Sequence, residues 1–522
     1  MRFALAWGLV FALTVPALSF EIGRRPRRGQ TIIETPPPVE PVKVDGDTWD
    51  AVYLDGQKAG YIHTTVREEK QDGKTVRKVQ RELNLTVKRF GQLAEVKAQV
   101  GTSETPEGKV LGLSLTQSLG KNVKLALTGR VSGDRLLLTL QGESPEANRE
   151  VSIPWDDAAI GLLGEENLLR DRRAKPGDKF SYRMFEPTVN NIVTTHVAVK
   201  NWETVPLNGV ARKLLRVETK PEKIQQVQLP MQTLWYDEAY RPVTSQVEMP
   251  GLGELTLRRS TQAEAQKPTG ELRDMSDLQS IVLNRLISRP HEQPNIVYRI
   301  TFAKGEDLDK MFPAGDDRQF VKLVGDKQIE LRISAVRKPA NKEDAKQPAE
   351  EFTKSNFFIT SDDKLVQKHA ADAVGEETDA WKKAQLIESW VHRNMRVLNF
   401  SEAMSPASEV ARTLEGDCTE YAMLTAAMCR VAGVPSRTAI GLVYHVDLGQ
   451  PKLSYHMWTE VWVNGSWLAL DATLGAGSVG PAHLKITDHS WYETRSMTPL
   501  LPVLRVMMNK PKVEVTKVGN AE

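Results

Sequence analysis

The sequence predicts a multidomain protein in which a β-rich N-terminal region is followed by an α+β C-terminal domain. The chain has 522 residues, too many for one ordinary hydrophobic core. Between Trp49 and Arg259, apolar and polar residues alternate with the period of two that is typical of strands. After residue 351 the apolar period becomes helical, and strand patterns return only beyond Pro435.

The charge and the motifs of the chain argue against several classes of protein. The formal net charge is only +2 and no basic face is evident, so we expect no nucleic-acid partner. No spacing typical of a metal site or of an acidic Ca²⁺ loop stands out, so no metal or other cofactor is expected. The stretch Gly475 to Gly480 lacks the strand-to-helix context of a phosphate-binding loop, which favours an ordinary flexible loop.

Residues 1–19 are predicted to be a secretory signal peptide. Met1-Arg2 is the charged start, Phe3 to Val15 the apolar centre, and Pro16 to Ser19 the small-residue exit, with cleavage after Ser19. We therefore expect an exported protein, periplasmic or secreted. The alternative is an uncleaved membrane anchor, for which the apolar stretch is short.

Residues 20–44 are predicted to be a linker rich in proline and arginine. The cluster Arg24 to Arg28 suits an acidic cell-envelope surface, and Pro36 to Pro38 favours an extended chain. A solvated linker without a partner is the other interpretation. Cell-envelope association and oligomeric state both stay open at this point.

Residues 45–268 are predicted to form an antiparallel β-rich region of one or two modules. Short strand patterns on either side of turns such as Ser132-Gly133-Asp134 favour an antiparallel sheet or a partial barrel. Two modules would divide near Leu162 to Pro176, and Ala159 to Leu169 is expected to be a short helix. His63 and His196 lie in strand patterns and are expected to be structural or surface residues.

Residues 269–337 are predicted to be a helix, Thr269 to Ser288, and a small β module with strands Ile296 to Phe302 and Gln328 to Val336. Residues 338–351, rich in Lys, Pro, Ala and Glu, are expected to be an exposed linker. Residues 352–490 then form the α+β domain, and residues 491–522 a C-terminal extension. The expected elements of this domain are helices Asp362 to Val374, Thr378 to Met395, Ser405 to Leu414 (capped by Ser405) and a helix running to Val431, and strands Ser436 to Tyr444, Tyr455 to Val463 and Ser466 to Ala472.

The helix that runs to Val431 is expected to place Cys418 in its first turn. Asp417 is a good N-cap and Glu420 can complete a capping box. The free N–H groups and the positive end of the helix dipole there favour a thiolate, which is the reactive form. The Cys418 N–H is also a candidate donor to an oxyanion.

The chain has two cysteines, Cys418 and Cys429, which predict two free thiols. On one helix they would be separated by roughly 16 Å of rise, well beyond the reach of a disulfide. A free thiol in an exported protein is a liability, which favours a function for Cys418. Cys429 lies among apolar residues and is interpreted as a core residue.

The dipeptide Asn464-Gly465 predicts a two-residue hairpin turn between the last two strands. In this register Trp458 faces Asp471 and His456 faces Thr473, so that His456 and Asp471 become diagonal neighbours on one face. A thiol, an imidazole and a carboxylate that orients the imidazole are the parts of a nucleophilic cysteine site.

Four segments together resemble the core of the transglutaminase-like superfamily, a papain-like α+β fold of cysteine acyltransferases and proteases. They are Gly416 to Glu420, Gly433 to Arg437, His456 to Val461, and Trp467 to Thr473. The resemblance covers about Asp362 to Leu484 and leaves the N-terminal β region outside. It implies that Cys418 attacks an amide carbonyl, that His456 carries the proton, and that Asp471 orients His456.

The resemblance implies acyl transfer or hydrolysis at an amide, either a protein glutamine or a peptide bond, without a cofactor. The substrate would be a protein or peptide, a cell-wall peptide included. A catalytically silent peptide-binding or scaffolding module of the cell envelope is the alternative, and an envelope assembly protein that works through its β region is a third reading.

Other polar and aromatic residues near these segments have two readings each. Glu420 and Glu460 are interpreted as a helix cap and a structural ion-pair partner rather than as an acid/base pair. Trp458, Trp462 and Trp467 share the face of His456 and Asp471, where they either line a substrate groove or pack.

Overall fold

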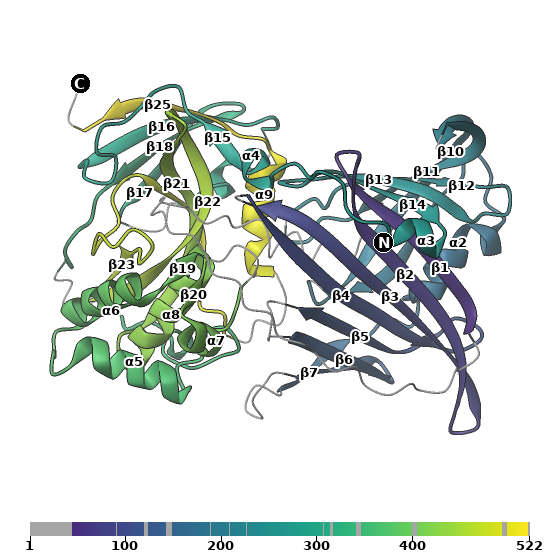
Figure 1. Ribbon diagram of the computed structural model, residues 1–522, viewed down its shortest axis with the longest axis horizontal. Coiled ribbons are helices and arrows are strands. Elements are labelled where there is room, and N and C mark those ends of the chain that lie inside the picture. Colours follow the sequence, from purple (N-terminus) through teal and green to yellow (C-terminus); the bar gives the residue numbers. More distant parts are fainter. Residues whose placement is uncertain are drawn as a thin grey trace.

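The computed structural model describes residues 44–519 apart from residues 90, 119–123, 142–148, 188, 208, 226, 306, 314–316, 341–345, 399–403 and 493–497. It has a large β-sheet and a mixed α/β part that lie side by side (Figure 1). The predicted fold class is thereby confirmed. The predicted signal peptide and the linker 20–44, apart from its last residue, lie outside the described residues.

The N-terminal region is one antiparallel sheet of 14 strands in the order β8-β7-β6-β5-β4-β3-β2-β1-β14-β13-β12-β11-β10-β9. Pairing of β1 with β14 joins the two halves into one sheet, so the alternative of two separate modules is wrong. The strands are β1 (Val44–Leu54), β2 (Gln57–Gln71), β3 (Lys74–Arg89), β4 (Gln92–Glu104), β5 (Val110–Ser118), β6 (Lys124–Ser132), β7 (Arg135–Gln141), β8 (Arg149–Pro154), β9 (Lys179–Glu186), β10 (Asn191–Leu207), β11 (Val210–Pro221), β12 (Gln232–Tyr236), β13 (Pro242–Met249) and β14 (Gly253–Ser260).

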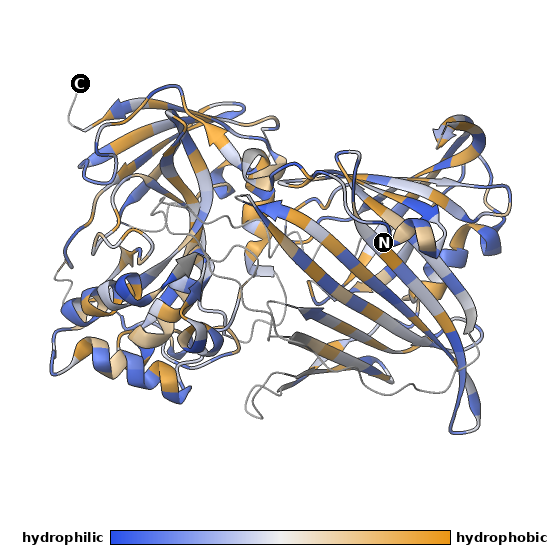
Figure 2. Cartoon of the chain, viewed as in Figure 1, coloured by the Kyte–Doolittle hydropathy of each residue, from blue (hydrophilic) through white to orange (hydrophobic). Residues whose placement is uncertain are grey.

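Alternating hydropathy along these strands produces the sheet (Figure 2). In β3, Leu83, Leu85 and Val87 are buried between more exposed neighbours, as a strand with one covered face requires. The expected short helix is α2 (Leu162–Arg172), which lies in sequence between the two edge strands.

The two lone histidines of the sheet have structural neighbours. His63 lies 2.7 Å from the Asp47 carboxylate and stacks on Trp49. His196 lies 3.1 Å from the carboxylate of Glu222. Their surroundings agree with structural or surface roles.

The helix expected from Thr269 to Ser288 is wrong. The structure has only the short helices α3 (Gln262–Ala265) and α4 (Met275–Leu278), followed by strand β15 (Ser280–Val282). Strand β15 pairs with the free edge of β22 in the C-terminal domain. Backbone pairing with a distant strand outweighs the local helical pattern here.

The small β module contains a strand from the far end of the chain. The strands β16 (Asn295–Thr301) and β18 (Gln328–Ser334) were expected, and β17 (Gln319–Gly325) was not. Its sheet has the order β17-β18-β16-β25, and β25 (Lys512–Val518) belongs to the predicted C-terminal extension. The extension therefore is an integral part of this sheet, which it reaches through helix α9 (Leu501–Met508).

The α+β domain packs its helices beside a second sheet, of order β15-β22-β21-β24 with β23 on β22. Helix α7 begins after Pro406, so Ser405 is not its cap; the Ser405 N–H instead donates to Glu420. The elements of this domain are α5 (Lys364–Val374), α6 (Ala380–Asn394), α7 (Ala407–Thr413), α8 (Cys418–Val431), β21 (Ser436–Asp447), β22 (Gln450–Val463), β23 (Ser466–Leu470) and β24 (His483–His489), with the short parallel pair β19 (Val397–Leu398) and β20 (Glu415–Gly416). Three 3-10 turns lie before and after these elements: η2 (Leu308–Lys310), η3 (Glu350–Phe352) and η4 (Thr498–Leu500).

The described residues of the predicted linker 338–351 are mostly exposed, as expected. None of the helices within the described part of the chain combines the length and the apolar character that crossing a membrane requires.

Candidate active site

Helix α8 places Cys418 at its first position. Asp417 caps the helix by accepting the N–H of Thr419, and Glu420 accepts the N–H of Asp417, which completes the predicted capping box. Gly416, with φ of +147°, precedes the cap, and a Cβ there would lie 2.3 Å from Glu420. The Gly-Asp-Cys-x-Glu pattern is thus explained by the geometry of this helix start.

The Cys418 side chain is fully buried, with 0 % of its surface exposed. Burial raises the pKa of its thiol well above the ordinary value, and the Asp417 carboxylate adds to the rise. A hydrogen bond from the Met457 backbone opposes the shift. In this structure burial therefore opposes the thiolate that the helix start favours.

Both cysteines are free, and Cys429 is buried in the core as predicted.

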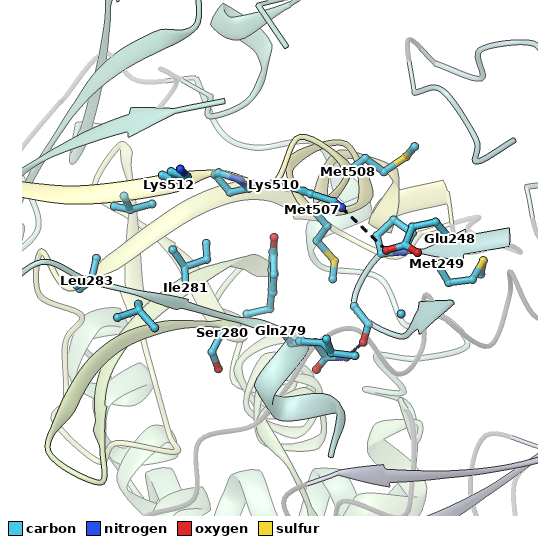
Figure 3. A pocket seen from close by; sticks show the side chains of 18 of the residues that line it. Glu248, Met249, Gln279, Ser280, Ile281, Leu283, Met507, Met508, Lys510 and Lys512 are labelled. Atoms are coloured by element: carbon cyan, nitrogen blue, oxygen red, sulfur yellow. Dashed lines mark hydrogen bonds and ion pairs between the residues drawn. The ribbon is translucent and has the colours of Figure 1, made fainter. Parts of the chain in front are cut away.

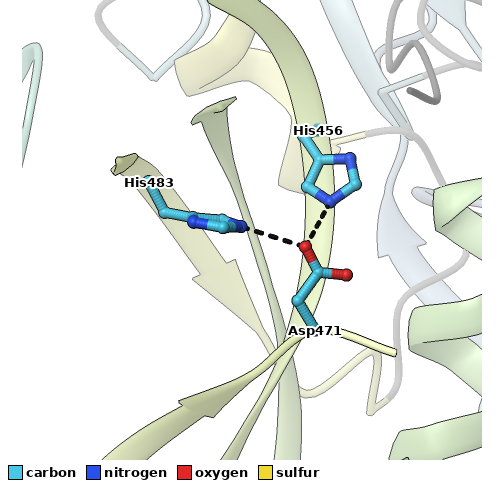
Figure 4. Close-up of side chains that lie close together, drawn as sticks. All are labelled: His456, Asp471 and His483. Carbon is cyan, nitrogen blue, oxygen red and sulfur yellow. Dashed lines mark hydrogen bonds and ion pairs between the residues drawn. The ribbon is translucent and has the colours of Figure 1, made fainter. Parts of the chain in front are cut away.

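The β22–β23 hairpin has the predicted register. Val463 faces Ser466, and the pairing continues to Thr459 opposite Leu470. Asn464 and Gly465 both have positive φ, 48° and 85°, as a type I′ turn requires. Asp471 is the first residue beyond β23, and its Oδ2 lies 2.8 Å from Nε2 of His456 (Figure 4).

The His456–Asp471 pair leaves one imidazole nitrogen available. A carboxylate only accepts hydrogen bonds, so Nε2 of His456 carries the proton. Nδ1 is buried and has no hydrogen-bond partner among the described residues. The other carboxylate oxygen of Asp471 accepts from the backbone N–H and the hydroxyl of Thr473. Burial alone would raise the pKa of Asp471. His456, with a smaller contribution from His483, nevertheless holds this pKa well below its ordinary value.

His483 belongs to the same cluster and was missed in the sequence. Its Nε2 lies 3.0 Å from Oδ2 of Asp471, and its side chain is fully buried. It lies on β24, a strand that we did not predict, although Leu484 and Ile486 alternate with polar residues there. The ligand atoms of His456, Asp471 and His483 all lie within 4.8 Å of one another, so this cluster is where a metal could be held. The hydrogen bonds from His456 and His483 to Asp471 explain why these atoms lie close together, so no metal ion is needed to explain it.

Glu420 and Glu460 have the structural partners expected of them. Glu420 closes the cap of α8. Glu460 contacts Arg437 at 2.7 Å and Lys485 at 2.9 Å. Burial alone would raise the pKa of Glu460, but Lys485 and Arg437 lower it to about 2.

Of the three tryptophans, Trp458 is fully buried and packs edge-on against His483, which favours the packing interpretation. Trp462 and Trp467 contact each other with ring centroids 5.5 Å apart.

The glycine loop after Asp471 is attached to helix α6. The Gly477 N–H donates to Glu388, and the Gln385 amide donates to the Gly477 carbonyl. These bonds hold the loop beside the His456–Asp471 pair.

The N-terminal sheet reaches the start of helix α8. Arg89, the last residue of β3, lies 3.3 Å from Oδ2 of Asp417, and both side chains are 1 % exposed. Because Asp417 directly precedes Cys418, a residue from the sheet lies beside the thiol-bearing turn.

A large cavity lies elsewhere, where the 14-stranded sheet meets the other two sheets (Figure 3). It has a volume of about 920 Å³, and methionine side chains and the chain around β15 and β25 line it. The cavity is not lined by Cys418, His456 or Asp471. It is lined by Tyr455, the residue before His456 in the sequence. This cavity is therefore distinct from the surroundings of Cys418, His456 and Asp471.

Comparison with known proteins identifies residues 367–472 as a transglutaminase-like superfamily domain, which confirms the resemblance. The chain is 30% identical over 97 residues to an uncharacterized protein of Haemophilus influenzae, covering 18% of this chain and 26% of that protein. It is 36% identical over 92 residues to the kyphoscoliosis peptidase of Mus musculus, covering 16% and 14%. The chain thus matches about a quarter of the first relative's length and a seventh of the second's.

The periplasmic domain of TgpA from Pseudomonas aeruginosa, bound to ethylmercury, aligns with 38% of this chain and 83% of its own, at 14% identity and a TM-score of 0.25.

Proposed function

We propose, from the premise that residues 367–472 are a transglutaminase-like domain, that this protein is an exported cysteine enzyme. It transfers or hydrolyses the acyl group of an amide, in a protein glutamine or a peptide bond, through Cys418, His456 and Asp471. The observation that carries the proposal is the buried His456–Asp471 hydrogen bond of 2.8 Å, with Nδ1 of the imidazole left unbonded among the described residues.

The reaction begins with a neutral thiol. As the sulfur of Cys418 attacks the amide carbonyl carbon, Nδ1 of His456 takes the thiol proton, so that no free thiolate is needed beforehand. The Asp471 carboxylate stabilises the imidazolium that forms. The Cys418 N–H, at the first position of α8, is a donor toward the oxyanion.

The tetrahedral intermediate then collapses. The C–N bond breaks, His456 gives its proton to the leaving amine, and a thioester on Cys418 forms. An amine or a water molecule attacks the thioester, again losing its proton to His456, and the thiol is released. An amine gives transfer and water gives hydrolysis.

The partners and the location are part of the same proposal. The substrate is a protein or peptide, a cell-wall peptide included, and the N-terminal sheet presents it or docks to the cell envelope. Export rests on the apolar first 19 residues.

The test incubates the mature protein with a glutamine-containing protein and a primary-amine probe, and mass spectrometry follows probe incorporation, deamidation and peptide cleavage. Wild type and Cys429→Ala are expected to react alike, because Cys429 lies in the core. Cys418→Ala and Asp471→Asn should lose activity by about 10³-fold or more. Activity that survives Cys418→Ala contradicts the mechanism.

One observation favours the second candidate, a catalytically silent peptide-binding module. The thiol is fully buried and its pKa is raised. This candidate predicts that peptides bind equally well to wild type and Cys418→Ala and that neither protein turns them over.

A further inference from the structure

The Asp471 carboxylate accepts hydrogen bonds from two imidazoles through one oxygen. His456 donates to Oδ2 at 2.8 Å and His483 donates to the same atom at 3.0 Å, from the other side (Figure 4). One histidine is enough for a thiol–imidazole–carboxylate site. The second one therefore needs an explanation.

His483 is a neutral donor. Burial lowers the pKa of its imidazole to about 3, against the opposing effect of Asp471, so the ring carries no charge near neutral pH. Its Nε2 bears the proton because a carboxylate cannot donate. Nδ1 is buried without a hydrogen-bond partner among the described residues, so the bond to Asp471 is the one polar contact described for this side chain.

The position of Asp471 explains why a second donor is useful. Asp471 follows the last residue of β23, and its backbone carbonyl accepts the N–H groups of Leu474 and Gly475. Its carboxylate still rotates about a torsion that has a broad minimum. Thr473 holds Oδ1. Without His483, the position of Oδ2 would depend on its hydrogen bond with His456 alone, because His483 holds it from the opposite side.

The groups that face His483 come from three elements. They are His456 and Trp458 of β22, Asp471 after β23, and His291 from the segment before β16, which meets the ring edge-on at 5.4 Å between centroids. Arg318 Nη2 donates to the backbone carbonyls of Gly480 and His483, at 3.0 Å and 3.5 Å. Within the described part of the chain, Asp471 is thus the one acceptor that the Nε2–H of His483 reaches.

We propose that His483 is a positioning residue: its Nε2–H holds Asp471 Oδ2 where that oxygen also accepts the Nε2–H of His456. The inference rests on the proposed function for its effect on turnover, whereas its geometric part stands without it. His483 touches neither the thiol nor a substrate in this role.

The test compares His483→Gln with His483→Phe in the mature full-length chain. Glutamine can place an amide N–H near the position of Nε2, whereas phenylalanine keeps the ring volume and loses the donor. With an amide substrate, His483→Phe should lower kcat by about 10-fold to 100-fold with KM little changed, and His483→Gln should recover most of the loss.

A second readout needs no substrate. In proton NMR the His456 and His483 Nε2–H groups on Asp471 should give low-field resonances in wild type, and Asp471→Asn should displace both. His483→Phe should remove the His483 signal and shift or broaden that of His456. If His483→Phe does not fold, His483→Asn replaces it, because its shorter side chain does not reach Oδ2.

Two outcomes overturn the proposal: an unchanged His456 resonance and kcat in His483→Phe, or equal impairment in His483→Gln and His483→Phe, which would mean packing. The wild-type protein could lack turnover while the His456 and His483 signals still change in the variants as expected. That result contradicts the proposed function and supports the positioning role.

Discussion

At the scale of single residues, Cys418 shows how burial and local structure compete. The helix start favours a thiolate, but the thiol has no exposed surface and carboxylates lie around it. Burial has the larger effect on the pKa of this thiol. A neutral thiol also resists oxidation.

We expect alkylation of Cys418 to be slow at neutral pH and to speed up as the pH rises. The reactive thiolate becomes populated only as the pH approaches the raised pKa of the thiol. The measurement is the rate of iodoacetamide labelling against pH, with Cys418→Ala to subtract labelling of the buried Cys429. Rapid labelling at pH 6 that His456→Ala slows would instead show a resting ion pair.

Buried His483 makes the stability of the protein depend on pH. The pKa of this side chain is lowered to about 3 in the fold, against about 6.5 in an unfolded chain. The unfolded state therefore binds more protons below pH 6.5, and stability falls with falling pH, by at most about 1.4 kcal/mol per unit from this residue. Asp471 and Glu460, whose pKa values are lowered, add losses only below about pH 4.

Urea unfolding between pH 7 and 4.5 tests this expectation. His483→Gln, which does not titrate, should show a flatter dependence than wild type. Equal slopes would contradict a buried neutral imidazole.

At the scale of elements, one hairpin turn determines how His456 and Asp471 are placed relative to each other. The two-residue turn sets the register of β22 and β23, and the register brings Asp471 to His456. A register slip by one residue would turn Asp471 to the other face.

Gly465→Ala is expected to destabilise the protein by about 1–2 kcal/mol, because alanine is strained at a φ of 85°. Gly449→Ala is a matched control: Gly449 has a φ of 79° in the turn between β21 and β22, at the opposite end of β22 from Gly465. Similar losses in urea unfolding, with turnover reduced only in Gly465→Ala, are expected. Equal turnover in both variants would mean that the turn does not position Asp471.

At the scale of the whole molecule, the β3–β4 turn ties the large sheet to helix α8. The Gly91 N–H donates to the carboxylate of Asp274, which also caps α4, and Arg89 reaches Asp417. A sheet far away in the sequence thus covers the start of the cysteine helix.

Arg89→Met should cost about 3–5 kcal/mol in urea unfolding, because it leaves the Asp417 carboxylate buried without this cation. Asp417→Asn keeps a helix cap, so Arg89→Met should cost less in that background. Lys109→Met, which breaks an exposed pair with Asp157, is the control and should cost under about 1 kcal/mol. Additive losses in the double variant would contradict the coupling. Faster alkylation of Cys418 in Arg89→Met would show that the turn covers the thiol.

The sequence by itself determined the features that neighbours along the chain decide. The capping box at Asp417 and the Asn464-Gly465 turn follow from a few adjacent residues, and so do the alternation of the large sheet and the approach of His456 to Asp471. Only the tertiary structure decided which distant segments meet. Two strand pairings join distant parts of the chain, β15 with β22 and β25 with β16. Two side-chain contacts do the same, His483 with Asp471 over 12 positions and Arg89 with Asp417 over 328. Burial of the thiol likewise depends on what packs over it, and desolvation by those distant elements outweighs the local helix start.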